Sequence, residues 1–306
     1  MALSLAHQIF ILFIMMFGGF ILVKFKLLPA SGSKVISELI IYLITPCVLI
    51  SSFQVKLTDE TRSGFLLCFV VALLIHAIFF VVTWILDRFF HFTPIEKVTV
   101  IYSNCGNLIF PLITALLGDE WVIYASAYLC LQTFFIWTHC LSVIEGSTRI
   151  DLKKILTNIN IIAIVIGVFL LFTGITLPSV INDTMDKLAA MIGPLSMIMV
   201  GMILSEVDLK SFLCNKRLYM VTILRMIVLP FITMLVLKFT PLAEMNPNGK
   251  TLLFISLLAA STPAAASVTQ LSQLYDREVK YSSALNAITT LTSIATMPLI
   301  IAFYYM

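Results

Sequence analysis

The chain has 306 residues, of which 60% are hydrophobic and only 11% are charged, and its mean hydropathy is +1.06. Soluble globular proteins carry about 25% charged residues, so this composition excludes a water-soluble domain and indicates an integral membrane protein. The net charge of +3 is small, and no nucleic-acid partner is expected. Six cysteines form no CxxC pair and four histidines form no HExxH pattern, so neither a disulfide framework nor a metal site is expected.

Ten apolar runs follow one another along the chain, each close to the roughly 20 residues that a helix needs to cross a bilayer. The first run is followed by no A-x-A-like cleavage site, so it is interpreted as a retained helix and not as a signal peptide. No soluble domain interrupts the runs. The predicted fold class is therefore an all-α membrane protein with ten transmembrane helices, at 5–25, 35–54, 64–86, 97–117, 121–144, 155–175, 187–205, 217–237, 250–273 and 281–304.

The lysines and arginines are distributed unequally between the two sides of these spans. Loops after the odd-numbered spans hold 13 of them, loops after the even-numbered spans hold 5, and Arg225 lies inside a span. Cytoplasmic loops carry the excess of positive charge, which predicts a multi-pass protein of the cytoplasmic membrane with both termini outside. The 13 are Lys24, Lys26, Lys34, Arg88, Lys97, Arg149, Lys153, Lys154, Lys210, Lys216, Arg217, Arg277 and Lys280.

An internal repeat relates the two halves of the chain. A shift of 157 positions superimposes LGDEWVIYASAYLCLQT (117–133) on LYDREVKYSSALNAITT (274–290), and seven of these 17 positions match. Each half has five spans, an odd number, so the second copy enters the membrane from the opposite side, as in many secondary transporters. The alternative is convergent helix composition. The predicted division is a first five-helix repeat at 1–145, a cytoplasmic linker at 146–154 and a second, inverted repeat at 155–306.

Spans four and nine both carry helix-disfavouring residues at mid-depth. Span four has Asn104, Gly106, Asn107 and Pro111, and span nine has Ser261, Thr262 and Pro263 in the stretch LAASTPAAASVTQ. Freed backbone groups are tolerated at that depth only inside protein or beside a wet cavity. Two broken helices with their N-termini near the midplane suit an anionic ligand, whereas a plain proline kink is the alternative reading. These seven residues are therefore predicted to bind substrate.

The same residues resemble the auxin efflux carrier family, including its bacterial malate/malonate permease-like members. Asn104 and Pro111 fit an N-x6-P pattern in span four, Pro263 follows small residues in span nine, and Pro298 lies in ATMPLIIAFYY. GPLSMIMVGMIL (193–204) is similar to the family's seventh span. The resemblance implies a ten-helix fold in which helices four and nine are broken and cross, together with organic-anion transport and a homodimer.

Three further polar residues lie inside spans and are candidates for the substrate site. Arg225 is expected to attract a carboxylate, to pair with a helix end, or to extend to the cytoplasmic interface. Gln270 and Asn286 carry amides that line a cavity or form hydrogen bonds between helices, two readings of equal weight.

The predicted function is a secondary active transporter that moves a small organic anion, such as a carboxylate, by alternating access. An ion-coupled symporter of another small solute and an anion channel remain alternatives. An intramembrane enzyme is less favoured because the chain has no GxSxG, GxGD or HExxH motif. No cofactor is expected, and Na⁺ or H⁺ stays open as a coupling ion. The expected partners are the organic anion, the lipid bilayer and a second copy of the chain.

Overall fold

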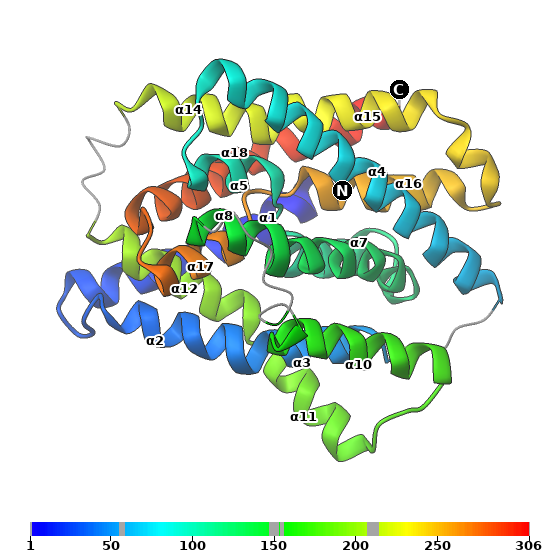
Figure 1. Cartoon of the computed structure of the whole chain (residues 1–306), viewed down its shortest axis with the longest axis horizontal. Coiled ribbons are helices and arrows are strands. Elements are labelled where there is room, and N and C mark those ends of the chain that lie inside the picture. The colour runs from blue at the N-terminus through cyan, green and yellow to red at the C-terminus, as the bar shows by residue number, and fades with distance from the viewer. Residues whose placement is uncertain (1, 55–58, 147–152, 154–155, 207–213, 306) are drawn as a thin grey trace.

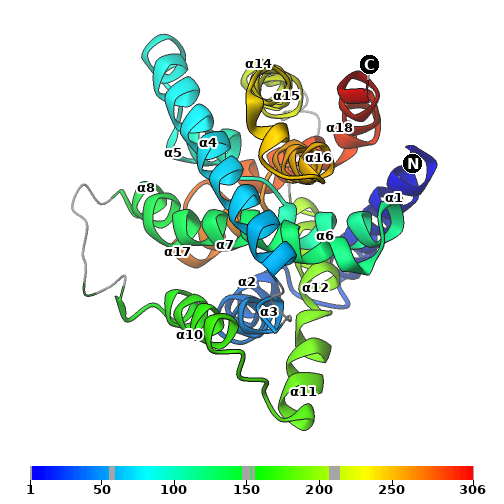
Figure 2. The same ribbon diagram turned by 90° about the vertical axis from the view of Figure 1, so that its right-hand side faces the viewer.

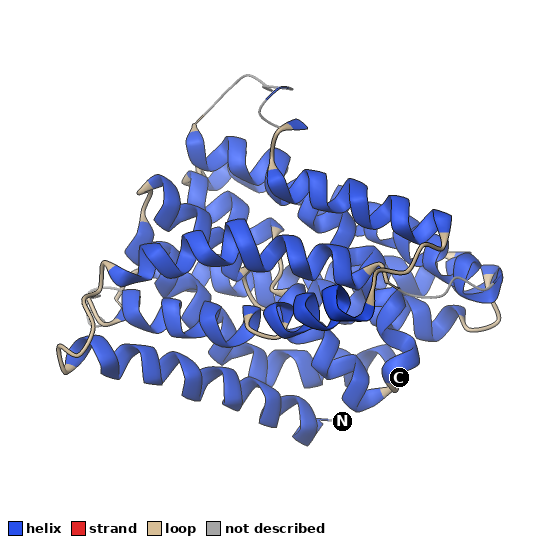
Figure 3. Cartoon of the chain, turned by 90° about the horizontal axis from the view of Figure 1, so that it is seen from below, coloured by secondary structure: helices blue, strands red, loops and turns tan. Residues whose placement is uncertain are grey.

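The computed structural model describes residues 2–54, 59–146, 153, 156–206 and 214–305, and these are almost entirely helical (Figure 1). Figure 3 contains helices and loops but no strand among the described residues. The all-helical prediction is therefore confirmed. The first half of the chain holds α1 (Ala2–Lys24), α2 (Gly32–Leu39), α3 (Thr45–Ser52), α4 (Asp59–Phe90), α5 (Pro94–Ile101), α6 (Cys105–Leu116), α7 (Val122–Phe135) and α8 (Leu141–Glu145).

The second half continues in the same way. It holds α10 (Ile159–Thr173), α11 (Ser179–Ala189), α12 (Ile192–Leu204), α14 (Lys216–Ile223), α15 (Leu229–Phe239), α16 (Gly249–Ser261), α17 (Ala266–Tyr275) and α18 (Val279–Tyr305). Short π or 3-10 turns join some of them: η1 (Ile40–Ile44), η2 (Asp119–Trp121), η3 (Ile136–Cys140), η4 (Leu224–Val228) and η5 (Pro241–Met245). Each of the ten predicted ranges thus contains helix.

Length and hydropathy separate these helices into two groups. Six continuous helical stretches are long and apolar enough to cross a membrane: Gly32–Ser52, Thr61–Phe90, Val122–Glu145, Ser179–Leu204, Lys216–Phe239 and Val279–Tyr304. Shorter apolar helices lie at Phe13–Lys24, Ile159–Thr173 and Gly249–Ser261. Two predicted spans are therefore not continuous helices: α5 is separated from α6, and α16 from α17.

Prolines explain two of the wide turns inside otherwise continuous helices. Proline removes a backbone donor, and its ring clashes with the carbonyl four residues earlier. For Pro46 that carbonyl belongs to Tyr42 in η1, and for Pro230 it belongs to Met226 in η4. A π turn enlarges the helix locally and so accommodates the ring. The helix therefore passes through each proline without breaking.

The two predicted halves do not pack as separate units. α1 packs against α12, α3 packs against α10 and α11, and α4 packs against α16 as well as α7. Seen along the helices, α16 lies inside the bundle, whereas α11 projects at its edge (Figure 2). All residues of α16 from 252 to 261 are buried, and α11 has no buried residue. The predicted linker 146–154 lies outside the described residues, apart from Gly146 and Lys153.

Candidate functional site

The first interruption separates α5 from α6 at residues 102–104. α5 begins with a capping box between Thr93 and Glu96, and it ends where Tyr102 becomes extended, with φ −96° and ψ 131°. Asn104 precedes α6 with φ −81° and ψ 43°, and its side chain makes no capping hydrogen bond. Pro111 lies well inside α6, so it is not the residue at which this span is interrupted. The structure describes the backbone of Asn107 and Pro111 but not their side chains.

The second interruption separates α16 from α17 at residues 262–265 and has a proline within it. A proline disfavours helical geometry in the residue before it. Thr262 precedes Pro263 and is extended, with φ −64° and ψ 158°. Ala265 is also extended, and α17 begins at Ala266. Pro263 therefore explains why α16 ends at Ser261.

The two interruptions pair with each other, and we call the region formed by 102–104 and 262–265 the junction. Ser103 and Ala264 form an isolated antiparallel bridge. The Asn104 N–H donates to the Pro263 carbonyl at 2.8 Å, and the Ala265 N–H donates to the Tyr102 carbonyl at 3.0 Å. Backbone groups freed by each broken helix are thus satisfied by the other.

The register of the junction differs from the repeat found in the sequence. The bridged residues Ser103 and Ala264 are 161 positions apart (264 minus 103), not 157. The shift of 157 would have matched Gly106 with Pro263. α6 has 12 residues and α17 has 10, and the loops after them also differ in length. The repeat therefore changes register by four residues between the junction and the helices that follow.

Side chains from α7 and α18 satisfy the outward-facing backbone groups of the bridged pair. The Gln132 amide accepts from the Ser103 N–H at 3.0 Å and donates to the Ser103 carbonyl at 2.7 Å. On the other side, the Ala264 N–H donates to the Thr289 hydroxyl at 3.1 Å, and Asn286 donates to the Ala264 carbonyl at 3.0 Å. Buried backbone groups are costly when unpaired, so these contacts stabilise both interruptions.

Gln132 was not among the predicted site residues, although the sequence held a signal for it. The shift of 157 superimposes Gln132 on Thr289, since 132 plus 157 is 289. Both lie in the helix that follows an interrupted span, and both bind the bridged residue of their own half. Asn286, which was predicted, takes part through its amide N–H, and its Oδ1 has no hydrogen-bond partner among the described residues.

Arg225 joins the ends of the two helices that lead into the junction. Its side chain is fully buried, which excludes the reading that it extends to the interface. One terminal nitrogen donates to the carbonyls of Val100 at 3.1 Å and Ile101 at 3.4 Å, at the end of α5. The other donates to the carbonyls of Ala260 at 2.8 Å and Thr262 at 3.0 Å, at the end of α16.

The chemistry of this contact follows from the helix dipole. Helix C-termini carry partial negative charge and unpaired carbonyls, and a planar guanidinium offers several donors in a fixed fork. Arg225 itself lies in the wide turn η4, and its guanidinium carbon is 5.4 Å from the centre of the Phe79 ring. The positive charge is therefore compensated by dipoles and an aromatic face. Among the described residues its Nε has no hydrogen-bond partner.

A cavity lies where the two helices leave the junction, beside the N-terminal ends of α6 and α17. Its volume is about 40 Å³, which is room for a few water molecules, since about 10–15 Å³ holds one. The first N–H groups of a helix have no carbonyl partner within that helix, so both ends present donors and partial positive charge. The polar residues that line the cavity are Thr45, Ser103, Asn104, Gln132, Thr133, Ser267 and Gln270.

Some of the predicted site residues line this cavity, and others lie in the helix ends and helices that surround it. Asn104, Gly106 and Gln270 line the cavity. The Asn104 amide nitrogen is buried without a hydrogen-bond partner among the described residues, whereas the Gln270 amide donates to the Ser196 hydroxyl at 2.9 Å.

The other predicted residues whose side chains the structure describes belong to the walls of the junction and not to the cavity lining. The Ser261 hydroxyl donates to the Leu257 carbonyl at 2.7 Å, and the Thr262 hydroxyl donates to the Ala259 carbonyl at 2.9 Å. Pro263, Arg225 and Asn286 hold the backbone, as described above. A methyl group at Gly106 would meet the Leu129 side chain at 3.4 Å, which is ordinary contact, so the structure gives no steric reason for glycine there.

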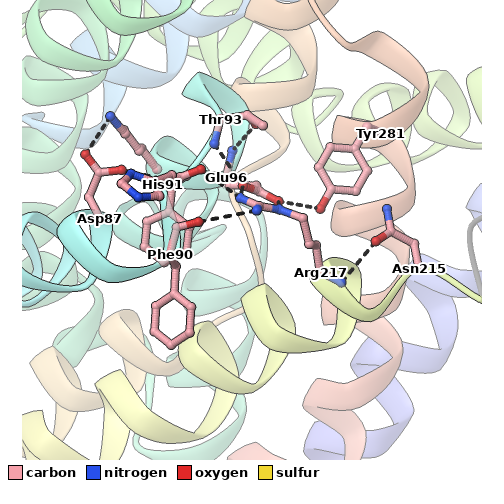
Figure 4. A network of polar contacts seen from close by, with 10 residues as sticks. Asp87, Phe90, His91, Thr93, Glu96, Asn215, Arg217 and Tyr281 are labelled. Carbon is pink, nitrogen blue, oxygen red and sulfur yellow. Dashed lines mark hydrogen bonds and ion pairs between the residues drawn. The ribbon is translucent and has the colours of Figure 1, made fainter.

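A buried ion pair fixes the outer end of α5 (Figure 4). Glu96 is fully buried, and Arg217 donates to its two carboxylate oxygens at 2.8 and 2.5 Å. Arg217 also donates to the His91 carbonyl at 2.9 Å, and Tyr281 donates to Glu96 at 2.9 Å. Burial opposes ionisation, but the hydrogen bonds from Arg217 and the other donors outweigh it and lower the pKa of Glu96. Residues after predicted spans three, seven and nine therefore meet at one end of the bundle.

The architecture already defines a class: many apolar helices, two of them interrupted inside the bundle, are typical of membrane transport proteins. The family model described as membrane transport protein matches residues 4–153 and 146–301, which is nearly the whole chain. The chain therefore belongs to this auxin efflux carrier-like family of multi-pass membrane proteins, a family of transporters and not of enzymes. No curated protein matches the chain.

Proposed function

We propose that the protein is a secondary active transporter that moves a small organic anion, such as a carboxylate, across the cytoplasmic membrane by alternating access. The observation that carries this proposal is the opposite polarity of the two sides of the junction. The negative helix ends meet a permanent cation, Arg225. The positive helix ends, at α6 and α17, instead face a cavity whose lining side chains are uncharged and include seven polar ones. A negatively charged ligand would therefore be favoured in this cavity.

The polar lining favours a short carboxylate, in keeping with the malate permease-like members of the family that the sequence resembles. Asn104, Ser267 and Gln270 offer amide and hydroxyl donors, and no acidic side chain lines the cavity among the described residues. A cavity of about 40 Å³ is too small for a dicarboxylate. Binding therefore requires the surrounding helices to separate, as alternating access demands.

The proposed topology has ten transmembrane helices in two inverted five-helix repeats, with both termini outside. The ion pair of Glu96 and Arg217 supports it, because loops after odd-numbered spans gather at one end of the bundle. Loops that follow even-numbered spans also meet, since the Leu177 N–H donates to the Gln54 side chain at 3.0 Å. The excess of lysine and arginine at the first end favours the cytoplasm for that end.

The proposal includes no cofactor. A Na⁺ or H⁺ gradient is the driving force that the proposal allows. A homodimer is proposed from the family resemblance, and cross-linking in membranes tests it.

Counterflow in proteoliposomes tests the function. Vesicles that contain the purified protein are loaded with one unlabelled mono- or dicarboxylate and diluted into its labelled form. A carrier accumulates label transiently, whereas a channel shows only a leak that follows the membrane potential. Asn104→Ala removes an unpaired donor of the cavity and should weaken apparent affinity about tenfold, since one bond to a charged group contributes about 1.5–3 kcal/mol. Leak without counterflow, or an Asn104→Ala variant with unchanged affinity, contradicts the proposal.

A further inference from the structure

A second cavity, of about 510 Å³, lies on the flank of α4 and shares no lining residue with the junction cavity. It is lined by α4, α5, η3 and α8, and its volume is in the range of small-molecule sites. Val81 and Trp84, which line it, are more than half exposed on the outer surface of α4. In a membrane-spanning chain that surface faces lipid, so the cavity opens toward the bilayer.

The cavity wall contains a polar group without a partner. Thr83 lines the cavity and is 4% exposed, and its hydroxyl has no hydrogen-bond partner among the described residues. Other buried threonine hydroxyls in these helices, such as those of Thr222 and Thr233, donate to the carbonyl one turn back at 2.8 Å. An unpaired buried hydroxyl is costly, so Thr83 indicates a ligand that carries a hydrogen-bonding oxygen at this depth.

One cation, Lys97, lines the cavity at the end beside the polar loop, and a second, Arg88, contacts the lining residue Trp84. Lys97 forms an ion pair with Asp87 at 2.7 Å, and the other oxygen of Asp87 accepts from the Phe92 N–H at 2.9 Å. An ammonium has three donors, so this ion pair leaves Lys97 able to bind a second anion. Arg88 stacks on Trp84, with its guanidinium carbon 4.0 Å from the ring centre. Tryptophan and arginine together are typical of the headgroup level of a bilayer.

We propose that this cavity binds one anionic phospholipid. Lys97 and Arg88 bind the phosphate, the Thr83 hydroxyl donates to an ester oxygen, and one acyl chain packs along Phe80 and Val81. Phospholipids combine a phosphate, ester oxygens a few ångströms deeper and a hydrocarbon chain, and the cavity presents its groups in that order. The family assignment says nothing of such a site, and the proposal does not depend on the transported substrate.

The lipid site is connected to the junction through two lining residues. Ile101 is the last residue of α5, and its carbonyl accepts from Arg225 at 3.4 Å. His139 pairs through Nδ1 with the Tyr102 hydroxyl at 2.8 Å, and the Tyr102 carbonyl accepts from Ala265. A bound lipid therefore restrains the end of α5 and, through it, the interrupted segment. Lipid occupancy is thereby proposed to stabilise the junction.

Thermal unfolding of the purified full-length protein in neutral detergent tests binding. Dioleoyl phosphatidylglycerol should raise the unfolding midpoint at lower concentration than dioleoyl phosphatidylcholine. Lys97→Gln and the exposed Arg88→Gln should each weaken the apparent affinity for phosphatidylglycerol roughly tenfold, and Thr83→Val should weaken it less. Lys216→Gln, an exposed cation outside the cavity, is the matched control and should change nothing. Equal effects of the two lipids, of inorganic phosphate alone, or of the control variant overturn the site.

Hydrogen–deuterium exchange tests the connection to the junction. Phosphatidylglycerol should slow exchange in the peptide that contains 100–106 more than phosphatidylcholine does, and Arg88→Gln should remove the difference. A lipid that binds with headgroup selectivity but leaves exchange at 100–106 unchanged overturns the connection.

Discussion

The interruption at 102–104 contains no proline, whereas the interruption at 262–265 contains Pro263, yet both end in the same backbone pairing. The two also differ in their support. One amide, Gln132, forms hydrogen bonds with both backbone polar groups of Ser103, while two residues, Asn286 and Thr289, share this role for Ala264. Proline is therefore not what maintains a broken helix in this bundle. Partners for the freed backbone groups are the common requirement.

Arg225 is the feature that both interruptions share, so its removal should have the largest effect. Arg225→Met orphans four carbonyls, and each unpaired buried group costs about 1–3 kcal/mol, so the folded state should lose at least ~3 kcal/mol. Arg225→Lys should lose less stability than Arg225→Met, because lysine keeps the positive charge but lacks the planar fork of donors. Thermal unfolding of the purified variants measures this. Lys216→Met, at an exposed position on the same helical stretch, is the control, and equal losses in both would contradict the assigned role.

Single substitutions should damage the first interruption more than the second. Gln132→Leu removes the partner of the backbone N–H, the carbonyl and the hydroxyl of Ser103, an expected loss of about 2–4 kcal/mol. Thr289→Val and Asn286→Leu each remove the partner of one backbone group of Ala264, about 1–2 kcal/mol. Unfolding midpoints of the three variants test the order. A Gln132→Leu protein as stable as Thr289→Val would show that the two supports are equivalent after all.

Pro263→Ala addresses the proline directly. Because Thr262, Ala264 and Ala265 keep their partners, the folded state should lose only about 1 kcal/mol, much of it through greater freedom of the unfolded chain. Transport should suffer more than stability, since the new N–H allows α16 to extend into the junction. Counterflow and thermal unfolding are compared on the same preparation. A loss of stability as large as that of Arg225→Met would restore proline as the main cause of the break.

The smallest effect concerns the outer end of α5, where Glu96 is paired. Its pKa is lowered on folding, so its contribution to stability is complete above the ordinary value of 4.5 and is lost as pH falls through the lower, folded value. The unfolding midpoint of the native protein should therefore drop on acidification below about pH 4.5, and Glu96→Gln should drop less over that range. Parallel curves for the two proteins would mean that other carboxylates govern the acid response.

The sequence predicted helix in every range and an interruption in spans four and nine, because apolar run length and clusters of proline and small polar residues are local signals. It did not predict that span four is interrupted before Gly106 and not at Pro111. It also missed Gln132, and it left three roles open for Arg225. These features depend on hydrogen bonds between residues 29 and 125 positions apart, such as Gln132 with Ser103 and Arg225 with Val100. No local pattern encodes such distances.

The hydrogen bonds that join the two interruptions run between main-chain atoms, from Asn104 to Pro263 and from Ala265 to Tyr102. Main-chain bonds do not depend on which side chain a residue carries, proline apart. The bridged positions Ser103 and Ala264 can therefore drift among small residues over evolutionary time while the scaffold around the cavity stays intact. New substrate preferences can arise by substitution of the lining side chains, because the main-chain hydrogen bonds of the junction do not depend on those side chains.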